Sequence, residues 1–393
     1  MDAETFIQTY AISRKKTDSL KWDALEERYG SADLLPLWVA DADFSTDEAV
    51  KQSLIKRVSE GAYGYTTRAS DYVSSYQGWQ NRHEGTKVRP EWLFFSTGVV
   101  QSLYDLIACF TEEQDKIMIQ PPVYYPFFNS IRDQKRTLVE TPLVNNQETY
   151  TMDFHQLEML FQTQDIRLFI LCSPHNPLGR VWTKEELVTF FTLCQTYNIR
   201  VISDEIHSDL IVFNNQFTSA LTVAEELGFS NVIMCNSPSK TFNLAGLLQS
   251  HIWIPDETLR ATFGEWSKRH RQTEISVLGQ VAAKTAYQKS DEWHQAFLKV
   301  VEANYLLLKT TLQKELPSVK ISPLQGTYLA WLNIEPLLKG ETAQEFIQQK
   351  AKLAIDYGEW FSPDYRQYIR INLATTPENI EQAINQILLA AKQ

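Results

Sequence analysis

The chain has 393 residues and a mass of 45.4 kDa, which is longer than one hydrophobic core usually extends, so about two domains are expected. With 44% hydrophobic and 22% charged residues, its composition is that of an ordinary globular protein and excludes a disordered or fibrous chain. The formal net charge of -11 and the scattered lysines and arginines leave no basic surface for a nucleic-acid backbone, so nucleic-acid binding is not expected.

The N-terminus, MDAETFIQTY, carries acidic residues where a signal peptide needs positive charge, and no apolar stretch approaches membrane-spanning length. Cysteines occur in apolar segments without CxxC or Cys/His ligand spacing, which favours core residues over disulfides or metal ligands. They are Cys109, Cys172, Cys194 and Cys235. We therefore expect a soluble protein of the reducing cytoplasm, with no metal and no membrane contact.

In chain order, the first element expected is a short strand at 37–40 (LWVA). Further on, apolar runs rich in β-branched residues alternate with helical patterns. The runs expected to be buried strands are 116–120, 168–172, 200–203, 232–235 and 250–254. The clearest helix begins at Thr183, where T-K-E-E forms a capping box. This alternation predicts an α/β domain with a mainly parallel sheet.

After about residue 285 the pattern changes to long helical stretches with two strand-like runs, 327–332 and 368–372. These features predict a smaller α+β domain. The first 45 residues are too few for a domain and are expected to pack onto it. The predicted division is therefore a large domain at 46–285 and a smaller one formed by 1–45 and 286–393.

Ligands of open α/β sheets bind beyond the carboxyl ends of the strands, so polar residues at strand ends are the candidates for chemistry. The run FFSTGVV at 94–100 leads into a helical pattern at 101–110, whose first backbone N–H groups suit a phosphate or serve only as a helix cap. In LCSPHNPLGR at 171–180, a rigid turn directs Asn176 towards a ring oxygen, or forms only an Asx-type turn.

Two further strand ends carry charged residues. Asp204 follows the apolar run in VISDEIH at 201–207, and a carboxylate there needs a cation such as a protonated pyridine nitrogen; an ion pair or helix cap is the alternative. Lys240 lies in NSPSKTFNLAG at 236–246, where burial would make its amine usable near neutral pH, unless it is a solvated surface lysine.

The run S-P-S-K at 237–240, followed by T-F-N-L-A-G, resembles the lysine motif of fold-type-I enzymes that use pyridoxal 5'-phosphate (PLP), and the other candidate segments follow in that family's order. Other stretches are similar to the MalY/PatB class of cystathionine β-lyases. They are LKWD (20–23), PLWVADADF (36–44), YGYT (63–66), PPVYYPF (121–127) and SDEIHSD (203–209). The resemblance implies the PLP-dependent transferase-like fold, with a mainly parallel seven-stranded sheet in the large domain.

The resemblance assigns roles around the cofactor ring. It implies that Lys240 carries PLP as a Schiff base, that Asp204 pairs with the pyridine nitrogen and that Asn176 contacts the ring hydroxyl. Tyr124 would stack on the ring face. His207 stands where many aminotransferases have a tyrosine near the cofactor hydroxyl, and its role is left open.

At the phosphate, the resemblance implies contacts from the backbone of Thr97, Gly98 and Val99 and from the Ser237 hydroxyl. Tyr65 resembles a tyrosine that reaches the phosphate region from a neighbouring subunit. A homodimer with a shared active site is therefore expected.

For the substrate, Arg370 in YIRINLA matches the family's arginine for the α-carboxylate, with a surface ion pair as the alternative. Trp38 and the Ala40 backbone resemble the segment that closes over that carboxylate, with a core residue as the alternative for Trp38. The preceding loop has Ser362 and Asp364 where the family pattern suggests glycines.

These residues serve two reactions equally well. A carbon–sulfur β-lyase would cleave cystathionine, cysteine or a related thioether to a thiol, pyruvate and ammonia, whereas an aminotransferase would need a 2-oxo acid acceptor. The closer resemblance favours the lyase. A PLP-binding transcription regulator is a third interpretation, but the 45 or so residues before the core pattern contain no helix-turn-helix candidate.

Overall fold

The computed structural model describes residues 1–83 and 85–393, and its largest sheet has seven strands in the order β2-β10-β9-β8-β7-β3-β4. Along the sheet these are β2 (Leu93–Ser96), β10 (Ser250–Trp253), β9 (Val232–Asn236), β8 (Arg200–Asp204), β7 (Ile166–Cys172), β3 (Lys116–Ile119) and β4 (Thr137–Glu140). The strands from β9 to β4 are parallel, and β10 runs antiparallel to both of its neighbours. The fold class predicted from the sequence is confirmed.

Both faces of this sheet are covered by helices, which explains why its strands are apolar on both sides. Alternate residues of β3 point to opposite faces: Ile117 and Ile119 to one, Met118 to the other. The first face packs against α6 (Val99–Phe110), α7 (Pro126–Arg132) and α12 (Glu257–Arg269). The second packs against α5 (Tyr72–His83), α8 (Phe154–Thr163), α9 (Lys184–Thr196), α10 (Ala220–Leu227) and α13 (Val277–Lys289).

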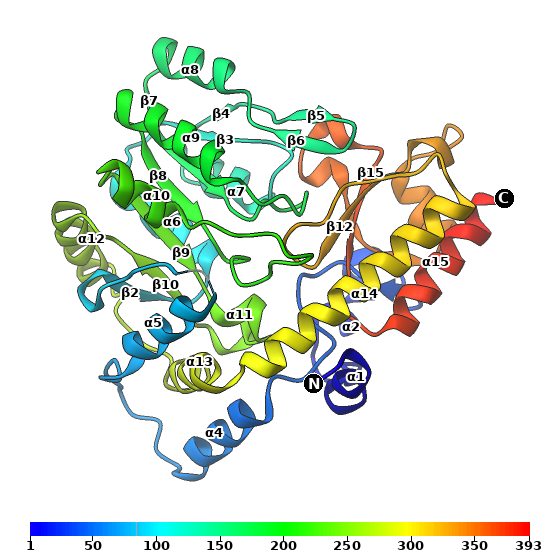
Figure 1. The fold of residues 1–393 in the computed structure, drawn as a ribbon, viewed down its shortest axis with the longest axis horizontal. Helices are drawn as coiled ribbons and strands as arrows, with labels where there is room; N and C mark the ends of the chain where they lie inside the picture. The colour runs from blue at the N-terminus through cyan, green and yellow to red at the C-terminus, as the bar shows by residue number, and fades with distance from the viewer. Residues whose placement is uncertain (84) are drawn as a thin grey trace.

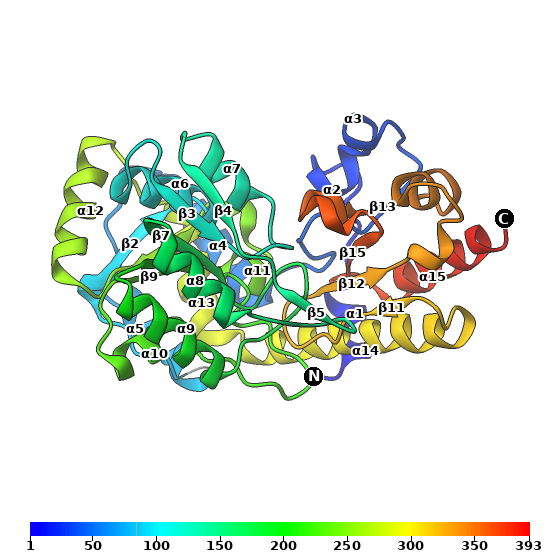
Figure 2. The ribbon, with the colours of Figure 1, turned by 90° about the horizontal axis from the view of Figure 1, so that it is seen from above.

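A second, antiparallel sheet lies beside the first, as Figure 2 shows. Its strands are β11 (Lys320–Ile321), β12 (Leu329–Asn333), β15 (Tyr368–Asn372) and β14 (Asp356–Tyr357), in that order. The long helix α14 (Asp291–Glu315) packs against α15 (Pro377–Ala391) and against α1 (Ala3–Tyr10) (Figure 1). The parallel pair β1 (Leu35–Pro36) and β13 (Leu353–Ala354) adds a second contact between the two ends of the chain.

Short elements complete the chain. They are α2 (Leu20–Asp23), α3 (Leu25–Tyr29), α4 (Glu48–Ser59), α11 (Pro238–Thr241), the hairpin β5 (Val144–Asn146) with β6 (Thr149–Thr151), the 3₁₀ turns Pro90–Trp92, Ala245–Leu247, Glu335–Leu337, Gly358–Trp360 and Pro363–Tyr365, and the π turn Glu345–Lys350. No helix in the described part of the chain has the length and apolar character needed to cross a membrane.

Most elements predicted from the sequence are confirmed. The capping box is present: Thr183 Oγ1 accepts from Glu186 N–H (3.2 Å) and Glu186 Oε2 accepts from Thr183 N–H (2.8 Å). The strand predicted at 37–40 is wrong, because the strand there covers only Leu35–Pro36. Beyond it, the Asn372 side chain donates to the carbonyls of Val39 (2.6 Å) and Asp41 (2.8 Å), which replaces a β-ladder with side-chain bonds. The domain boundaries stay a prediction.

Candidate active site

A cavity of about 180 Å³ lies where β7, β8 and β9 end and α6 begins. Most of the site residues predicted from the sequence line it: Ala40, Thr97, Gly98, Val99, Tyr124, Asn176, Asp204, His207, Ser237 and Lys240. The sequence pointed to these residues separately, and parallel strand ends bring them to one edge of the sheet. The lining residues that it did not single out are Val100, Cys172, Ile206, Ser239, Ala245 and Gln249.

Two helix N-termini face one end of the cavity. In α6 the backbone bonding begins with Ser102 N–H to Gly98 O (2.9 Å), so the N–H groups of the first turn are free of intrahelical partners. Ser237 caps α11 by accepting from Ser239 N–H (3.1 Å), and its hydroxyl donates to Gln249 O (2.7 Å). Free N–H groups and the positive end of a helix dipole together favour an anion.

Asp204 ends β8 with its carboxylate at the cavity wall, and it is 4% exposed. Its Oδ1 accepts from Ile206 N–H (3.1 Å), and no cationic side chain among the described residues forms an ion pair with it. Burial raises the pKa of this carboxyl to about 7, against the opposing effects of that hydrogen bond and of Lys240. A buried carboxylate in this state favours a cationic ligand group.

Lys240, on α11, points its amine at the N-terminal segment. Nζ donates to the carbonyl of Ala40 (2.6 Å), which also accepts from the Tyr328 hydroxyl (2.7 Å). Burial lowers the pKa of this amine to about 8; nearby Asp41 opposes that shift and Arg370 adds to it. An appreciable part of the amine is therefore neutral near neutral pH, which is the form that forms covalent bonds and accepts protons.

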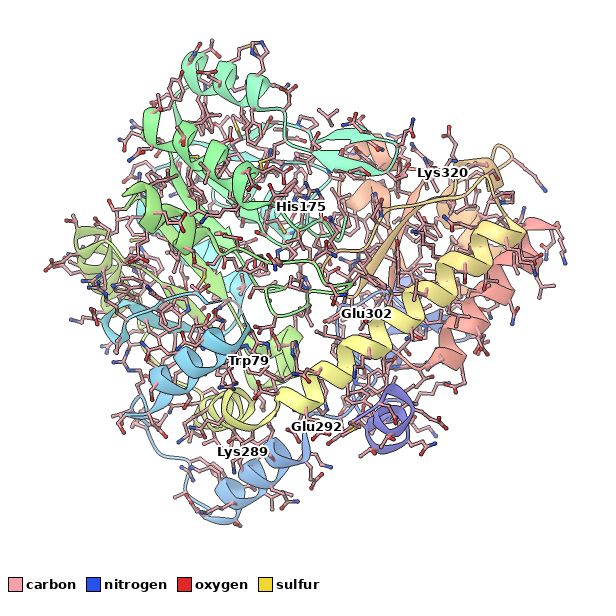
Figure 3. The ribbon with its side chains drawn as sticks, viewed as in Figure 1. Trp79, His175, Lys289, Glu292, Glu302 and Lys320 are labelled. Carbon is pink, nitrogen blue, oxygen red and sulfur yellow. The ribbon has the colours of Figure 1, made fainter. Side chains whose placement is uncertain are left out.

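Asn176 is fixed by the turn after β7. The turn closes through Gly179 N–H to His175 O (2.9 Å), and Gly179 has a positive φ of 66°. A Cβ at Gly179 would lie 2.7 Å from Leu324 Cδ1, so both backbone and space require glycine. His175 lies between the two sheets in Figure 3, and its Nε2 donates to the carbonyl of Pro122 (2.8 Å). Burial lowers the pKa of this imidazole to about 4, so it is neutral.

Arg370 lies behind Asn176, which it contacts through Nη1 and Asn176 Oδ1 (2.8 Å). Nη2 donates to Trp38 O (3.1 Å) and forms an ion pair with Asp356, the residue opposite Arg370 in the β14–β15 register. The guanidinium carbon lies 5.0 Å from the centre of the Phe361 ring. Arg370 thus adjoins the cavity with its orientation fixed on several sides.

Besides Arg370, which contacts the lining residue Asn176, two predicted site residues do not line the cavity. The Trp38 ring is buried against Tyr29, with ring centres 5.5 Å apart, and its Nε1 donates to Lys21 O (3.1 Å). The core alternative therefore describes its side chain, while its backbone carbonyl holds Arg370. Tyr65 is 99% exposed and outside the cavity of its own chain.

His207 forms part of the cavity wall, with the edge of its ring against the Tyr328 ring (centres 6.1 Å apart). Burial lowers its pKa far below the usual range, and the charges of Lys240 and Arg370 add to the shift. Its Nδ1 has no hydrogen-bond partner among the described residues. The imidazole is therefore neutral.

The loop before Arg370 accommodates the residues that replace glycines. Ser362 has extended backbone (φ -172°) and caps a 3₁₀ turn by accepting from Asp364 N–H (3.4 Å). The close approach occurs instead at Gly358, where a Cβ would lie 2.0 Å from Tyr365 O. The departure from the family pattern thus leaves the loop without strain at these positions.

Comparison with known proteins places this geometry in a family. Residues 7–387 match the family described as aminotransferase class I and II. The chain belongs to this family.

Individual relatives match over nearly their whole length. The chain is 36% identical over 380 residues to cystathionine beta-lyase PatB of Bacillus subtilis, covering 96% of this chain and 97% of that protein. Among solved structures, cystalysin from Treponema denticola, described as containing a pyridoxal 5'-phosphate cofactor, has a TM-score of 0.93 at 31% identity, with 97% and 98% of the chains covered. The PLP-bound C-S lyase from Staphylococcus hominis has a TM-score of 0.91 at 31% identity, with 98% and 97% covered.

Proposed function

We propose that this chain is a PLP-dependent carbon–sulfur β-lyase that cleaves cystathionine- or cysteine-type thioethers into a thiol, pyruvate and ammonia. The observation that carries the proposal is the placement of the Lys240 amine, the unpaired Asp204 carboxylate and the first turn of α6 around one cavity. Each would otherwise be a costly buried group, and one cofactor accounts for all three. The preference for a lyase over an aminotransferase is supported by the named relatives.

The residues present fit PLP. The first turn of α6 and the Ser237 hydroxyl would hold the phosphate, Asp204 would face the pyridine nitrogen, and Asn176 would face the ring hydroxyl. The aromatic ring of Tyr124 would cover one ring face and exclude water. When bound, the cofactor supplies an electron sink that stabilises negative charge at the substrate Cα.

Substrate orientation would come from Arg370. A guanidinium donates charge-assisted hydrogen bonds to an α-carboxylate, and the Nε of Arg370, which has no partner among the described residues, would be the donor for that bond. Because Asn176, Trp38 O and Asp356 already hold the guanidinium, little conformational entropy is lost on binding. The substrate would thus present its Cα–H bond in one direction.

Proton transfer would fall to Lys240. Its Nζ, neutral in part because its pKa is about 8, would accept the proton from Cα. The Cβ–S bond then breaks, with the electron pair leaving on sulfur, and the proton held on Nζ is available to the departing thiolate. Water converts the remaining aminoacrylate to pyruvate and ammonia. His207, in the wall of the same cavity, would stay neutral because burial lowers the pKa of its imidazole far below the usual range.

We further propose a cytoplasmic homodimer in which Tyr65 completes the partner's site. Support comes from a run of exposed apolar side chains on and after α4, which are uncommon on a monomer surface unless they form an interface. These are Ile55 (58% exposed), Val58 (46%), Tyr63 (56%) and Tyr65 (99%). None of the four cysteines, all of them among the described residues, forms a disulfide, which agrees with a cytoplasmic location.

The test is product formation from L-cystathionine with and without a 2-oxo acid. A lyase forms pyruvate, ammonia and homocysteine in equal amounts without an acceptor, and the acceptor changes nothing. Conversion that requires the 2-oxo acid would identify an aminotransferase instead and overturn the proposal.

A further inference from the structure

Lys240 stands on α11, a helix of four residues (Pro238–Thr241). A single helical turn is unstable by itself, because helix nucleation costs more than one hydrogen bond returns. The position of the Lys240 amine therefore depends on bonds between this turn and its neighbours. Three residues around Lys240 make such bonds: Ser237, Thr241 and Asn243.

Two of these residues bond to backbone carbonyls. Ser237 Oγ donates to Gln249 O (2.7 Å). Asn243 Nδ2 donates to the carbonyls of Ala42 (3.0 Å) and Phe44 (2.8 Å), on the N-terminal segment. They hold the turn from two sides but do not connect it to the residues that end β8.

The third residue, Thr241, bonds to a charged side chain. Thr241 is fully buried, and its Oγ1 donates to Asp209 Oδ2 (2.7 Å). The other carboxylate oxygen, Oδ1, accepts from Nε1 of Trp79 on α5 (2.7 Å). The Asp209 carbonyl accepts from Nε2 of His294 on α14 (2.6 Å), an imidazole that burial keeps neutral by lowering its pKa to about 4. Figure 3 shows Trp79 between α5 and α14.

Asp209 belongs to the segment that follows β8, which ends at Asp204, and the same segment carries His207. Glu205 fixes this segment, since its carboxylate accepts from Ser219 Oγ (2.8 Å) and Ala220 N–H (2.8 Å). The strands β8 and β9 already pair side by side, with Glu205 N–H donating to Cys235 O (2.8 Å). The Thr241–Asp209 bond adds a side-chain connection beyond the strand ends, between the turn with Lys240 and the segment after Asp204.

We propose that Asp209 is a positioning residue that, through Thr241, sets the place of the Lys240 amine relative to Asp204 and His207. The inference rests on the proposed function, because it concerns the geometry in which Lys240 meets the cofactor. Asp209 lies beneath the turn and outside the residues that line the cavity, so it acts through Thr241 rather than on the cofactor.

The expected effect of replacing Thr241 follows from the loss of its hydrogen bond to Asp209. Thr241→Val keeps the shape of the side chain but leaves the half-buried Asp209 carboxylate one donor short, and hydrogen bonds to charged groups are worth more than neutral ones. We expect Thr241→Val to weaken PLP binding about tenfold or more. The amine would also lose its fixed direction, so kcat should fall while KM changes little.

The experiment uses the PLP-loaded enzyme and three variants. The readouts are the dissociation constant for PLP, the midpoint of the pH titration of its visible absorption, and kcat against KM. Thr241→Ser keeps the hydroxyl and should stay within about threefold of the parent. Thr111→Val is the matched control: Thr111 is also buried and bonded to a charged side chain, Arg136 (2.9 Å), but at the far end of α6.

The proposal predicts that Thr241→Val shifts both the dissociation constant and the titration midpoint, that Thr241→Ser restores them, and that Thr111→Val leaves them unchanged while lowering stability. Unchanged values in Thr241→Val, or equal changes in Thr111→Val, would overturn it. If Thr241→Val does not fold, Asp209→Asn is the second probe and should change both readouts in the same direction. A parent protein that binds no PLP would instead defeat the proposed function itself.

Discussion

Arg370 and Asp356 form a buried ion pair across neighbouring strands of the small sheet, with both side chains 3% exposed. Burial raises the pKa of the Asp356 carboxyl, and the guanidinium opposes that shift. Burying two charges has a large desolvation cost, and the attraction between the two side chains offsets it. Each charge is therefore stable in the buried position only while the other is present. The substrate arginine is therefore part of the stability of the fold as well as of the site.

Replacing only one residue of the Arg370–Asp356 pair should lower the free energy of unfolding far more than replacing both. We expect Arg370→Met to lower the free energy of unfolding by about 3–5 kcal/mol, because Asp356 is then a buried charge without a partner. The double variant with Asp356→Leu should recover most of that loss while staying inactive. Denaturant unfolding of the single and double variants measures both. Additive losses would show that the ion pair does not govern this strand contact.

How much of the site the sequence predicts depends on the element that carries each residue. Asp204, Asn176 and Lys240 follow strands with clear apolar patterns, so the sequence pattern alone predicts that they meet at one sheet edge. Asp356 could not be predicted in this way, because β14 has two residues and no periodicity, and its pairing with Arg370 follows from tertiary register. Gln249 lines the cavity although it belongs to none of the sequence motifs.

Trp38 and Asp209 show that a sequence pattern does not predict the contacts of a side chain either. The resemblance located Trp38 near the substrate, but sequence carries no information on its rotamer, and the ring turns to Tyr29. Asp209 lies within SDEIHSD, yet its contact with Thr241 arises only when β8 and β9 lie side by side. Local pattern predicts elements, whereas long-range packing decides these contacts.

The second prediction concerns Lys240 and pH. In the cofactor-free protein, burial lowers the pKa of this amine from 10.5 to about 8. Between these pH values the unfolded chain binds a proton that the folded chain does not, so stability rises with pH across this window and the penalty is full below pH 8. Lys240→Met should therefore be more stable than the parent at pH 7 by about 3 kcal/mol, and the difference should vanish towards pH 10.5.

Urea unfolding of both cofactor-free proteins at a series of pH values between 7 and 10.5 checks this prediction. A stability difference between the two proteins that stays constant over the series would mean that the surroundings of Lys240 do not lower the pKa of its amine.

The third prediction concerns the shared site. If Tyr65 serves the partner's cavity, a dimer of one Tyr65→Ala and one Lys240→Ala protomer contains one intact site and one site with both changes. Mixing equal amounts of the two inactive proteins under conditions of subunit exchange should restore about one quarter of the parent activity. Activity no greater than the sum of the separate variants would place Tyr65 outside the partner's site.

The central claim is that Lys240 holds the cofactor in the cavity at the ends of β7, β8 and β9. Borohydride reduces the carbon–nitrogen double bond between a lysine and PLP to a stable amine, so the attachment point survives proteolysis. Peptide mass spectrometry of the reduced, PLP-loaded protein should place the adduct on Lys240, and Lys240→Ala should carry none. An adduct on a different lysine, or unmodified Lys240 in the loaded protein, would contradict the account.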